Sequence, residues 1–217
     1  MNQPTLNEIL TSIKQPVIAT VHKDPDPDAI GSLLALYFIC KQFKIKLECY
    51  ASDFIETKFD YLPGSTIINK KPIHQSYKTL IFLDCSNQYR VQKHKELPAA
   101  DAIINIDHHQ DNTHFGNINL IKNISSVGEL LFNECVSMNI QITKDIATNL
   151  YAAIAFDTGS FQYSNTTSNT FFAASKLIET NFNTHEINQR LFDNKSSEYY
   201  NEVTIGLKNL FLDETYP

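Results

Sequence analysis

The sequence predicts an α/β fold with a mainly parallel sheet and helices on both faces. Short runs of β-forming residues alternate along the chain with amphipathic helical patterns, which is the order that parallel strands and their crossover helices require. The chain has 217 residues, 42% of them hydrophobic, so it can bury a sizeable core in one large domain. Acidic residues follow several of the predicted strands, at the sheet edge where open α/β folds place their ligands.

The predicted elements follow one another along the chain. Apolar runs indicate strands over residues 17–21, 80–83 and 103–106. Apolar residues at helical spacing indicate helices over residues 30–43, 127–138, 146–154 and 167–191, and a further helix within the last twenty residues. Ser126 and Glu129 have the spacing of a capping box at the start of one helix. Gly159 permits another helix to stop, which puts Asp157 just beyond a helix end.

The composition excludes several classes of protein. With 24 acidic and 18 basic residues the net charge is -6, which is no broad basic surface for a polyanion, so any nucleic-acid contact must be local. The six glycines form neither a P-loop nor a GxGxxG turn. Four cysteines without a CxxC pair indicate buried thiols in a reducing compartment. No apolar run approaches the roughly 20 residues that cross a bilayer. We therefore expect a soluble, cytoplasmic protein that does not act at a membrane.

The first candidate site is an acidic segment between a predicted strand and a predicted helix. It contains His22, Asp24, Asp26, Asp28, Gly31 and Ser32, in the order HKDPDPDAIGS. Three aspartates and a histidine so close together repel one another unless a cation or a proton relieves the charge. The plain structural alternative is a solvated turn in which Asp28 caps the helix that follows.

Two further candidate segments also follow predicted strands. Asp84 ends an apolar run, although aspartate in that place is often only a turn former. Asp107, His108 and His109 end another, with Asn112 close behind. An acid beside two histidines suits metal chemistry, because an imidazole that ligates through one nitrogen needs an acceptor for its other N–H. The alternative is an ordinary polar loop.

The fourth candidate is Asp157, in the sequence DTGSFQYSNT. A helix end followed by a turn explains Gly159. It does not explain Asp157, because a carboxylate is unfavourable near the negative end of a helix dipole.

Together, in this order and spacing, these four segments resemble the motifs of the DHH phosphoesterase superfamily, named for the triplet found here as Asp107, His108 and His109. The resemblance covers nearly the whole chain. The DAIGS form of the first motif and the DTGSFQYSNT form of the fourth look most like the oligoribonuclease and phosphoadenosine-phosphatase branch. The similarity to family II inorganic pyrophosphatases is weaker.

The resemblance implies a site for two divalent cations. One cation would be held by His22, Asp26 and Asp84, and the other by Asp28, Asp84, His108 and Asp157. Asp84 would bridge them, and four carboxylates would balance two divalent charges. Oxygen and imidazole ligands without sulfur favour Mn²⁺, with Mg²⁺ as the alternative.

The resemblance also suggests roles for residues that are not ligands. His109 would contact the phosphate or the leaving group as a catalytic residue, with proton donation as one role. Asp107 would orient a histidine, and Asn112 would make a polar contact with the substrate. Gly31 and Ser32 would offer backbone N–H donors to phosphate at the helix start.

The chain departs from the family pattern in three ways. Asp24 stands where asparagine is frequent, and Pro27 replaces a frequent glycine, but neither change removes a ligand. The third departure is a missing second lobe. We expect residues 1–195 to form the metal-binding catalytic domain, and residues 196–217 to form a linker helix toward a substrate-binding lobe that is absent from this chain.

The expected reaction is hydrolysis of phosphate esters by a metal-bridged water. The expected substrates are short oligonucleotides or 3′-phosphorylated adenosine nucleotides. A metal-binding regulatory or interaction module without turnover is an alternative, because the chain stops abruptly at Pro217. A pyrophosphatase-like hydrolase is another. A homodimer is left open as the oligomeric state.

Overall fold

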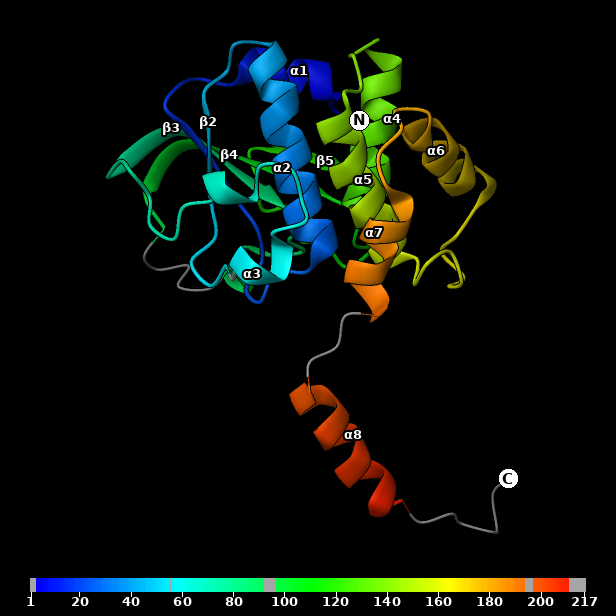
Figure 1. Ribbon diagram of the computed structural model, residues 1–217. Helices are drawn as coiled ribbons and strands as arrows, with labels where there is room; N and C mark the ends of the chain where they lie inside the picture. The colour runs from blue at the N-terminus through cyan, green and yellow to red at the C-terminus, as the bar shows by residue number, and fades with distance from the viewer. Residues whose placement is uncertain (1–2, 55, 92–96, 194–196, 211–217) are drawn as a thin grey trace.

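A five-stranded parallel sheet forms the centre of the computed structural model (Figure 1), with the strands in the order β2-β1-β3-β4-β5. The structure describes residues 3–54, 56–91, 97–193 and 197–210. The strands are β1 (Val17–Thr20), β2 (Leu47–Tyr50), β3 (Ser76–Leu83), β4 (Ala99–Asp107) and β5 (Ile118–Ile121). Each neighbouring pair runs parallel. The predicted α/β class with a mainly parallel sheet is confirmed.

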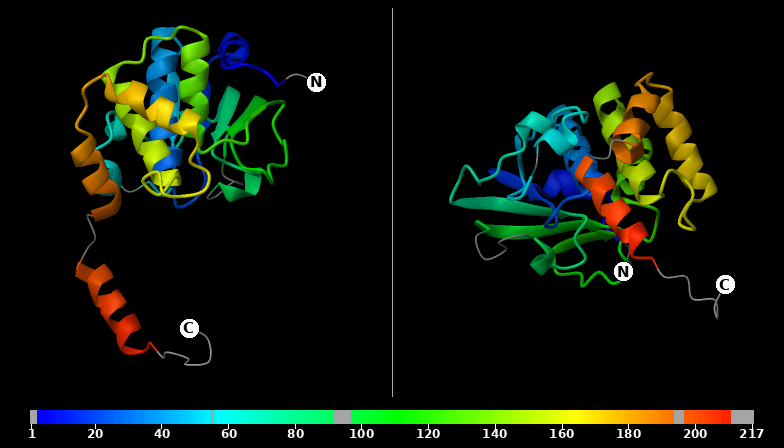
Figure 2. Two further views of the ribbon diagram at one scale, coloured as in Figure 1. Left: turned by 90° about the vertical axis from the view of Figure 1, so that its right-hand side faces the viewer. Right: turned by 60° about the horizontal axis from the view of Figure 1, so that its bottom comes forward.

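Helices form the second layer. Those that contribute to the main core are α1 (Leu6–Ser12), α2 (Pro27–Gln42), α3 (Glu56–Phe59), α4 (Val127–Ser137), α5 (Lys144–Asp157), α6 (Ser168–Ile178) and α7 (Thr184–Asn188). Short turns are η1 (Ser65–Ile67), η2 (Gln88–Arg90) and the π-helical η4 (Gln189–Asp193). The left view of Figure 2 shows this helical layer on one side of the sheet.

Helical cover on the two faces of the sheet is unequal. Successive strand residues alternate between two buried clusters, as Ala19 and Ile18 do. The cluster that contains Ala19 holds the apolar residues of the α-helices. The cluster that contains Ile18 is smaller and, among the described residues, is built from strand and loop side chains, with Val91 directly after η2. The α-helices therefore stabilise mainly one face.

The structure refines several predicted boundaries. Strands β2 and β5 were not predicted, and Asp157 is the last residue of α5 rather than lying just beyond the helix. Ser126 caps α4 as expected and accepts from the Glu129 N–H at 3.0 Å. The carboxylate of Glu129 does not complete a capping box, because it accepts from the hydroxyl groups of Ser125 and Thr170.

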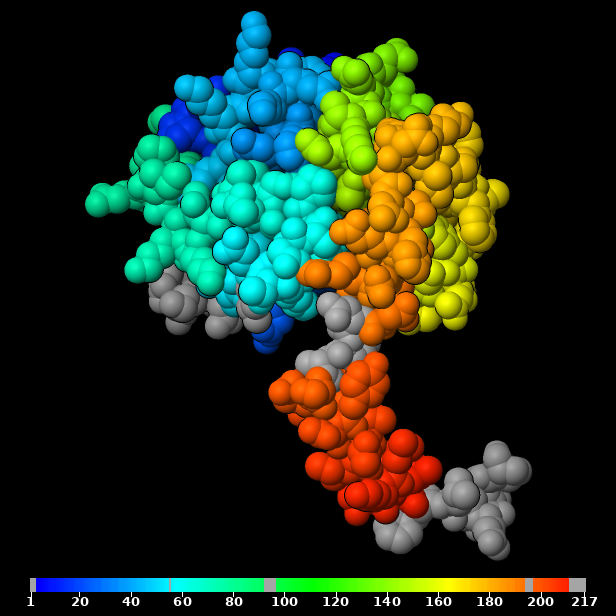
Figure 3. Space-filling view, in the orientation of Figure 1, coloured from blue at the N-terminus to red at the C-terminus, as the bar shows by residue number. Residues whose placement is uncertain are grey.

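The helix α8 (Ser197–Lys208) has no buried residue and stands clear of the main body in Figures 1 and 3. It covers most of the predicted linker, whose role stays a prediction. The predicted domain boundary at residues 195 and 196, and residues 211–217, lie outside the described residues. In the part of the chain that the structure describes, no helix has the length and apolar character to cross a membrane.

The order of the strands fixes where a ligand can bind. The chain passes from β1 to β2 on one side, and then crosses over to β3 on the other side of β1. The change of direction makes the gap beyond β1 and β3 a topological switch point, which is where open α/β sheets bind ligands.

The helices α2 and α5 border this gap and pack closely against each other. A Cβ atom on Gly31 of α2 would lie 2.5 Å from the Asn149 carbonyl oxygen and 3.4 Å from the Ala153 Cβ of α5. Since the first of these atoms belongs to backbone, only glycine permits this approach.

We predict that Gly31→Ala destabilises the fold by about 1–3 kcal/mol, because the added methyl group overpacks the helix contact. The matched control is Gly206→Ala in α8, where a Cβ would have nothing within 4 Å. Thermal unfolding followed by circular dichroism should show a lower Tm for the first variant only. Equal Tm values for the two variants would contradict the packing role of Gly31.

Candidate metal centre

Ionisable side chains from distant parts of the sequence meet at the carboxyl edge of the sheet. They come from the loop after β1, the start of α2, the end of β3, the end of β4 and the end of α5. The residues are His22, Asp26, Asp28, Asp84, Asp107, His108, His109 and Asp157. The segments singled out in the sequence therefore share one site, and the polar-loop and solvated-turn alternatives do not describe them.

Asp84 lies at the centre of the site. It is only 3% exposed, and its backbone has a left-handed φ of 56°, which is unusual for a residue other than glycine. One carboxylate oxygen, Oδ2, faces His22 Nε2 at 3.4 Å, and the other, Oδ1, faces His108 Nε2 at 3.5 Å. Within the described residues, Oδ1 accepts no hydrogen bond. Because a buried carboxylate oxygen without a partner is costly, this atom points to a ligand.

The first group of potential ligands is His22, Asp26 and Asp84, the set expected for one cation. His22 donates through Nδ1 to the Lys23 carbonyl at 2.7 Å, which leaves Nε2 free to face the site. Asp26 is the N-cap of α2 and accepts from the Ala29 N–H through Oδ1 at 2.9 Å. Its other oxygen, Oδ2, lies 3.6 Å from His22 Nε2.

The second group is Asp28, His108 and Asp157, which are three of the four residues expected for the other cation. His108 donates through Nδ1 to the Ile124 carbonyl at 3.2 Å. Its Nε2 lies 3.2 Å from Asp157 Oδ2 and 3.8 Å from Asp28 Oδ2. Asp84 stands between the two groups and presents one oxygen to each histidine, so the geometry suits the bridging role that was predicted for it.

The plain alternative supposed that Asp28 caps the helix that follows it. In the structure Asp26 caps α2 instead, and Asp28 accepts hydrogen bonds from another helix. Its Oδ2 accepts from the Val127 N–H at 2.9 Å, and its Oδ1 accepts from the Gly128 N–H at 3.0 Å. Both donors belong to the first turn of α4. The helix start therefore holds this fully buried carboxylate with two N–H groups and with the positive end of its dipole.

Two predicted phosphate contacts are placed differently. Gly31 and Ser32 are buried in the second turn of α2, where helical hydrogen bonding occupies the backbone N–H groups. They therefore do not offer backbone donors to a ligand. Gly31 packs on α5 instead, and the Ser32 hydroxyl donates to Asp28 Oδ1 at 3.1 Å.

The third group of potential ligands adds the DHH triplet to Asp84. Asp107 is fully buried and accepts from His109 Nδ1 at 2.7 Å and from the Asn112 amide at 2.5 Å. Asn112 also donates to the Cys85 carbonyl at 3.1 Å. The amide nitrogen of Asn112 thus donates to Asp107 and to the Cys85 carbonyl. The predicted contact of Asn112 with the substrate is not supported by this arrangement. Asp107 does contact a histidine, as predicted, and that histidine is His109.

Arg90 is a site residue that the sequence did not single out. Its Nη1 donates to His109 Nε2 at 3.2 Å, so in this geometry His109 Nε2 is an acceptor, not the proton donor that was one expected role. The available signal was weak. Arg90 is a basic residue six positions after Asp84, in a segment where no helical or strand pattern fixed its direction.

Burial and neighbouring charges shift the pKa values of several side chains in the site. Burial, reinforced by neighbouring carboxylates, raises the pKa of Asp28 to about 7 and that of Asp157 to about 9. Burial would lower the pKa of His22 and His108, but the facing carboxylates outweigh it and raise each pKa to about 10. Burial opposes ionisation of Asp84, yet the two histidines hold its pKa well below the usual range. The side chains thus retain protons that metal binding would displace.

The donor set fits divalent cations. Within each of the three groups, the ligand atoms lie within 4.8 Å of one another. All donors are carboxylate oxygens or imidazole nitrogens, which suit Mn²⁺ and Mg²⁺ better than metals that prefer sulfur. The unpaired Asp84 Oδ1 supports the same conclusion.

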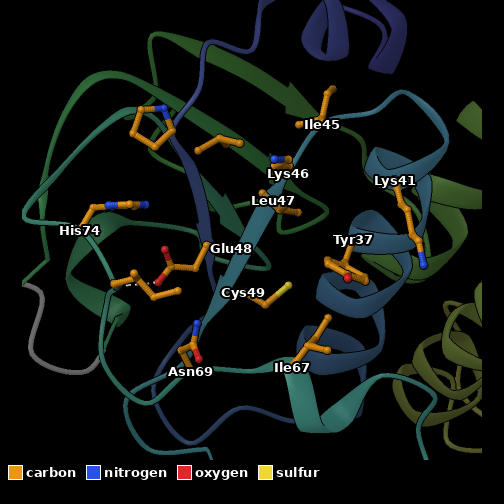
Figure 4. A pocket seen from close by; sticks show the side chains of 13 residues that line it. Tyr37, Lys41, Ile45, Lys46, Leu47, Glu48, Cys49, Ile67, Asn69 and His74 are labelled. Atoms are coloured by element: carbon orange, nitrogen blue, oxygen red, sulfur yellow. Dashed lines mark hydrogen bonds between the residues drawn. The ribbon is translucent and has the colours of Figure 1, made fainter.

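A separate hollow of about 410 Å³ runs along the outer edge of β2 (Figure 4), and none of the residues above line it. Its carboxylate, Glu48, accepts from the Tyr77 hydroxyl at 2.5 Å and from the Ile73 N–H at 2.8 Å. Because this acid is already satisfied, the hollow does not compete with the sheet edge as the candidate site.

Comparison with curated proteins finds relatives over most of the chain. The bifunctional oligoribonuclease and PAP phosphatase NrnA of Thermus thermophilus is 29% identical over 190 residues, which are 85% of this chain and 56% of that protein. The protein of the same name from Bacillus subtilis is 27% identical over 188 residues, 85% of this chain and 59% of that protein. The chain thus spans less than two thirds of these relatives.

Solved structures show the same fold. An exopolyphosphatase-related protein from Bacteroides fragilis superposes with a TM-score of 0.85 at 22% identity, over 97% of this chain and 66% of that one. The model of the DHH family, N-terminal domain, matches residues 16–154, which include five of the six predicted metal ligands and the whole DHH triplet. This match covers more than half of the sequence, and the chain therefore belongs to the DHH family.

Proposed function

We propose that this domain is a divalent-cation-dependent phosphoesterase that hydrolyses short oligonucleotides or 3′-phosphorylated adenosine nucleotides. The observation that carries the proposal is the placement of Asp84 between His22 and His108, with one carboxylate oxygen facing each imidazole. The substrate class is supported by the relatives named oligoribonuclease and PAP phosphatase.

His22, Asp26 and Asp84 would hold one cation, and Asp28, Asp84, His108 and Asp157 the other. We propose Mn²⁺, with Mg²⁺ as the alternative. When bound, the two cations would supply an activated water and stabilise the charge on the phosphate oxygens. Each histidine is preset for this task, because a backbone carbonyl binds its Nδ1 and directs its Nε2 into the site.

The other polar residues of the site would act on the substrate side. The buried Asp107 fixes the ring of His109, and Asn112 fixes Asp107 in turn. In this geometry His109 Nε2 accepts from Arg90, so the proposed contact of His109 with the phosphate or the leaving group would require the release of that hydrogen bond. Asp107 and Asn112 are positioning residues in this scheme, since Asp107 accepts from His109 and Asn112 donates to Asp107.

We predict that Asp84→Ala and Asp157→Ala lose more activity than the 10–100-fold that removal of an outer-shell partner of a metal ligand usually costs. Each change removes a ligand outright. Hydrolysis of a dinucleotide would be measured with added Mn²⁺. The matched control is Asp101→Ala, because this carboxylate is 65% exposed and pairs with Lys78, outside the candidate site.

Equal rates for wild type and both site variants would rule out the mechanism. Pyrophosphate would be tested in parallel, since faster phosphate release from it would favour the pyrophosphatase alternative. Metal binding without turnover of any phosphate compound would favour the regulatory module.

We predict a pH-dependent stability that added Mn²⁺ removes. His22 and His108 have raised pKa values of about 10, so their stabilising effect is complete below the unfolded value near 6.5 and is lost as the pH rises toward 10. Asp157, whose pKa is raised from 3.8 to about 9, adds to this loss until it ionises near pH 9, whereas Asp28, with a pKa raised to about 7, contributes mainly below pH 7. Chelator-treated protein should therefore lose roughly 5 °C or more in Tm between pH 6.5 and 9.5.

Differential scanning fluorimetry would follow this change. With saturating Mn²⁺ the fall should largely disappear, because the cation replaces the lost protons. A Tm that depends on pH in the same way with and without Mn²⁺ would contradict the assignment.

A further inference from the structure

We propose that Arg90 binds the substrate phosphate. Its guanidinium would add a positive charge from the protein beside the two proposed metal ions. This inference rests on the proposed function and assigns one more residue to the same site. It starts from the contact between the Arg90 guanidinium and His109.

The backbone of Arg90 is anchored beside the first motif. Its carbonyl accepts from the Lys23 N–H at 2.7 Å, which ties η2 to the loop that carries His22. At the start of the same turn, the Asn87 side chain accepts from the Tyr89 N–H at 3.0 Å. The side chain therefore leaves from a fixed point at the rim of the site.

The guanidinium has the charge and the free donors that an anion needs. It is half-buried, and among the described residues no carboxylate lies within the 4.0 Å of an ion pair with it. Arg190 provides the contrast, because it is paired with Asp60 and lies over the Tyr61 ring. Of the five N–H donors of Arg90, the contact with His109 uses one.

The position of Arg90 relates it to the metal ligands. His109 Nε2 lies 3.2 Å from Arg90 Nη1, and His109 Nδ1 lies 3.5 Å from Asp84 Oδ1. One imidazole thus separates the guanidinium from the carboxylate that both predicted cations would share. A phosphate at the cations would have its remaining oxygens within reach of a planar, two-pronged donor, which is the geometry that arginine offers to phosphate.

The tautomer of His109 explains why the positively charged Arg90 guanidinium can lie next to it. His109 directs its N–H to Asp107, so its Nε2 presents a lone pair to the guanidinium. This contact holds Arg90 beside the site, although none of the carboxylates in the described residues forms an ion pair with it. A fixed positive charge of this kind stabilises the charge that develops on the phosphate oxygens without reorganisation during the reaction.

The test compares Arg90→Ala and Arg90→Lys with the control Arg190→Ala. The first measurement is the affinity of the Mn²⁺-loaded protein for inorganic phosphate, by isothermal titration calorimetry. Loss of hydrogen bonds to a charged group should weaken binding by about 10–100-fold in Arg90→Ala. Arg90→Lys should show a smaller loss, because it keeps the charge without the planar fork. Arg190→Ala should bind phosphate as wild type does.

Two further measurements separate phosphate binding from a structural role. The affinity for Mn²⁺ alone and the Tm should be unchanged in all three variants. Where dinucleotide hydrolysis is observed, kcat/KM should fall by about 10²–10³ in Arg90→Ala, and added guanidinium ion should restore part of it. Should Arg90→Ala fail to fold, Arg90→Lys remains the test, with reduced phosphate affinity at an unchanged Tm.

Phosphate affinity in Arg90→Ala within twofold of the control would overturn the inference, and so would an equal loss of Mn²⁺ affinity. The result is distinguishable from a failure of the proposed function. A protein that hydrolyses no ester, but loses phosphate binding with Arg90, would refute the function and keep this assignment. Hydrolysis by Arg90→Ala at the wild-type rate would refute the assignment of Arg90 and keep the proposed function.

Discussion

The structure depends on how the charge of four carboxylates is neutralised at one edge of the sheet. Asp26, Asp28, Asp84 and Asp157 face one another across two imidazole rings. In a partly buried site such charges repel strongly, because little water screens them. Protonation of both histidines would offset only half of the negative charge. Protons on Asp28 and Asp157, whose pKa values are raised to about 7 and 9, offset the rest where no metal is bound. Two divalent cations would offset all four charges and displace these protons.

A different feature of the backbone is associated with the position of each carboxylate. Asp26 caps α2, and Asp28 accepts from the first turn of α4. Asp84 has a left-handed backbone, a strain that persists only where the surroundings impose it. Asp157 occupies the unfavourable end of α5. Hydrogen bonds and backbone conformation therefore position these carboxylates, and the fold bears the energetic cost of bringing their charges together.

Sequence motifs were sufficient to predict the class of the fold and to single out six candidate ligands that meet at one sheet edge, because each motif follows a strand or borders a long helix. They could not place partners that depend on tertiary contacts. Nothing near Asp28 in the sequence indicates that Val127 would donate to it. Arg90 lies in a segment without a regular pattern. Strands β2 and β5 have four residues, as β1 does, but Glu48 and Asn119 interrupt their apolar runs, so no continuous run marks them.

The fourth motif extends several residues beyond Asp157 because the turn that follows this residue helps to position it. After Asp157, Gly159, Ser160 and Phe161 have left-handed φ values of 54°, 57° and 66°. A Cβ on Gly159 would lie 2.4 Å from the Tyr163 ring, so glycine is needed for the turn to close. Asn165 then donates to the carbonyls of Asp157 and Ser125. Since Ser125 immediately precedes the cap of α4, and α4 holds Asp28, the turn couples Asp157 to Asp28, two of the three carboxylates that face His108. Residues beyond the ligand are thus required to fix the distance between ligands.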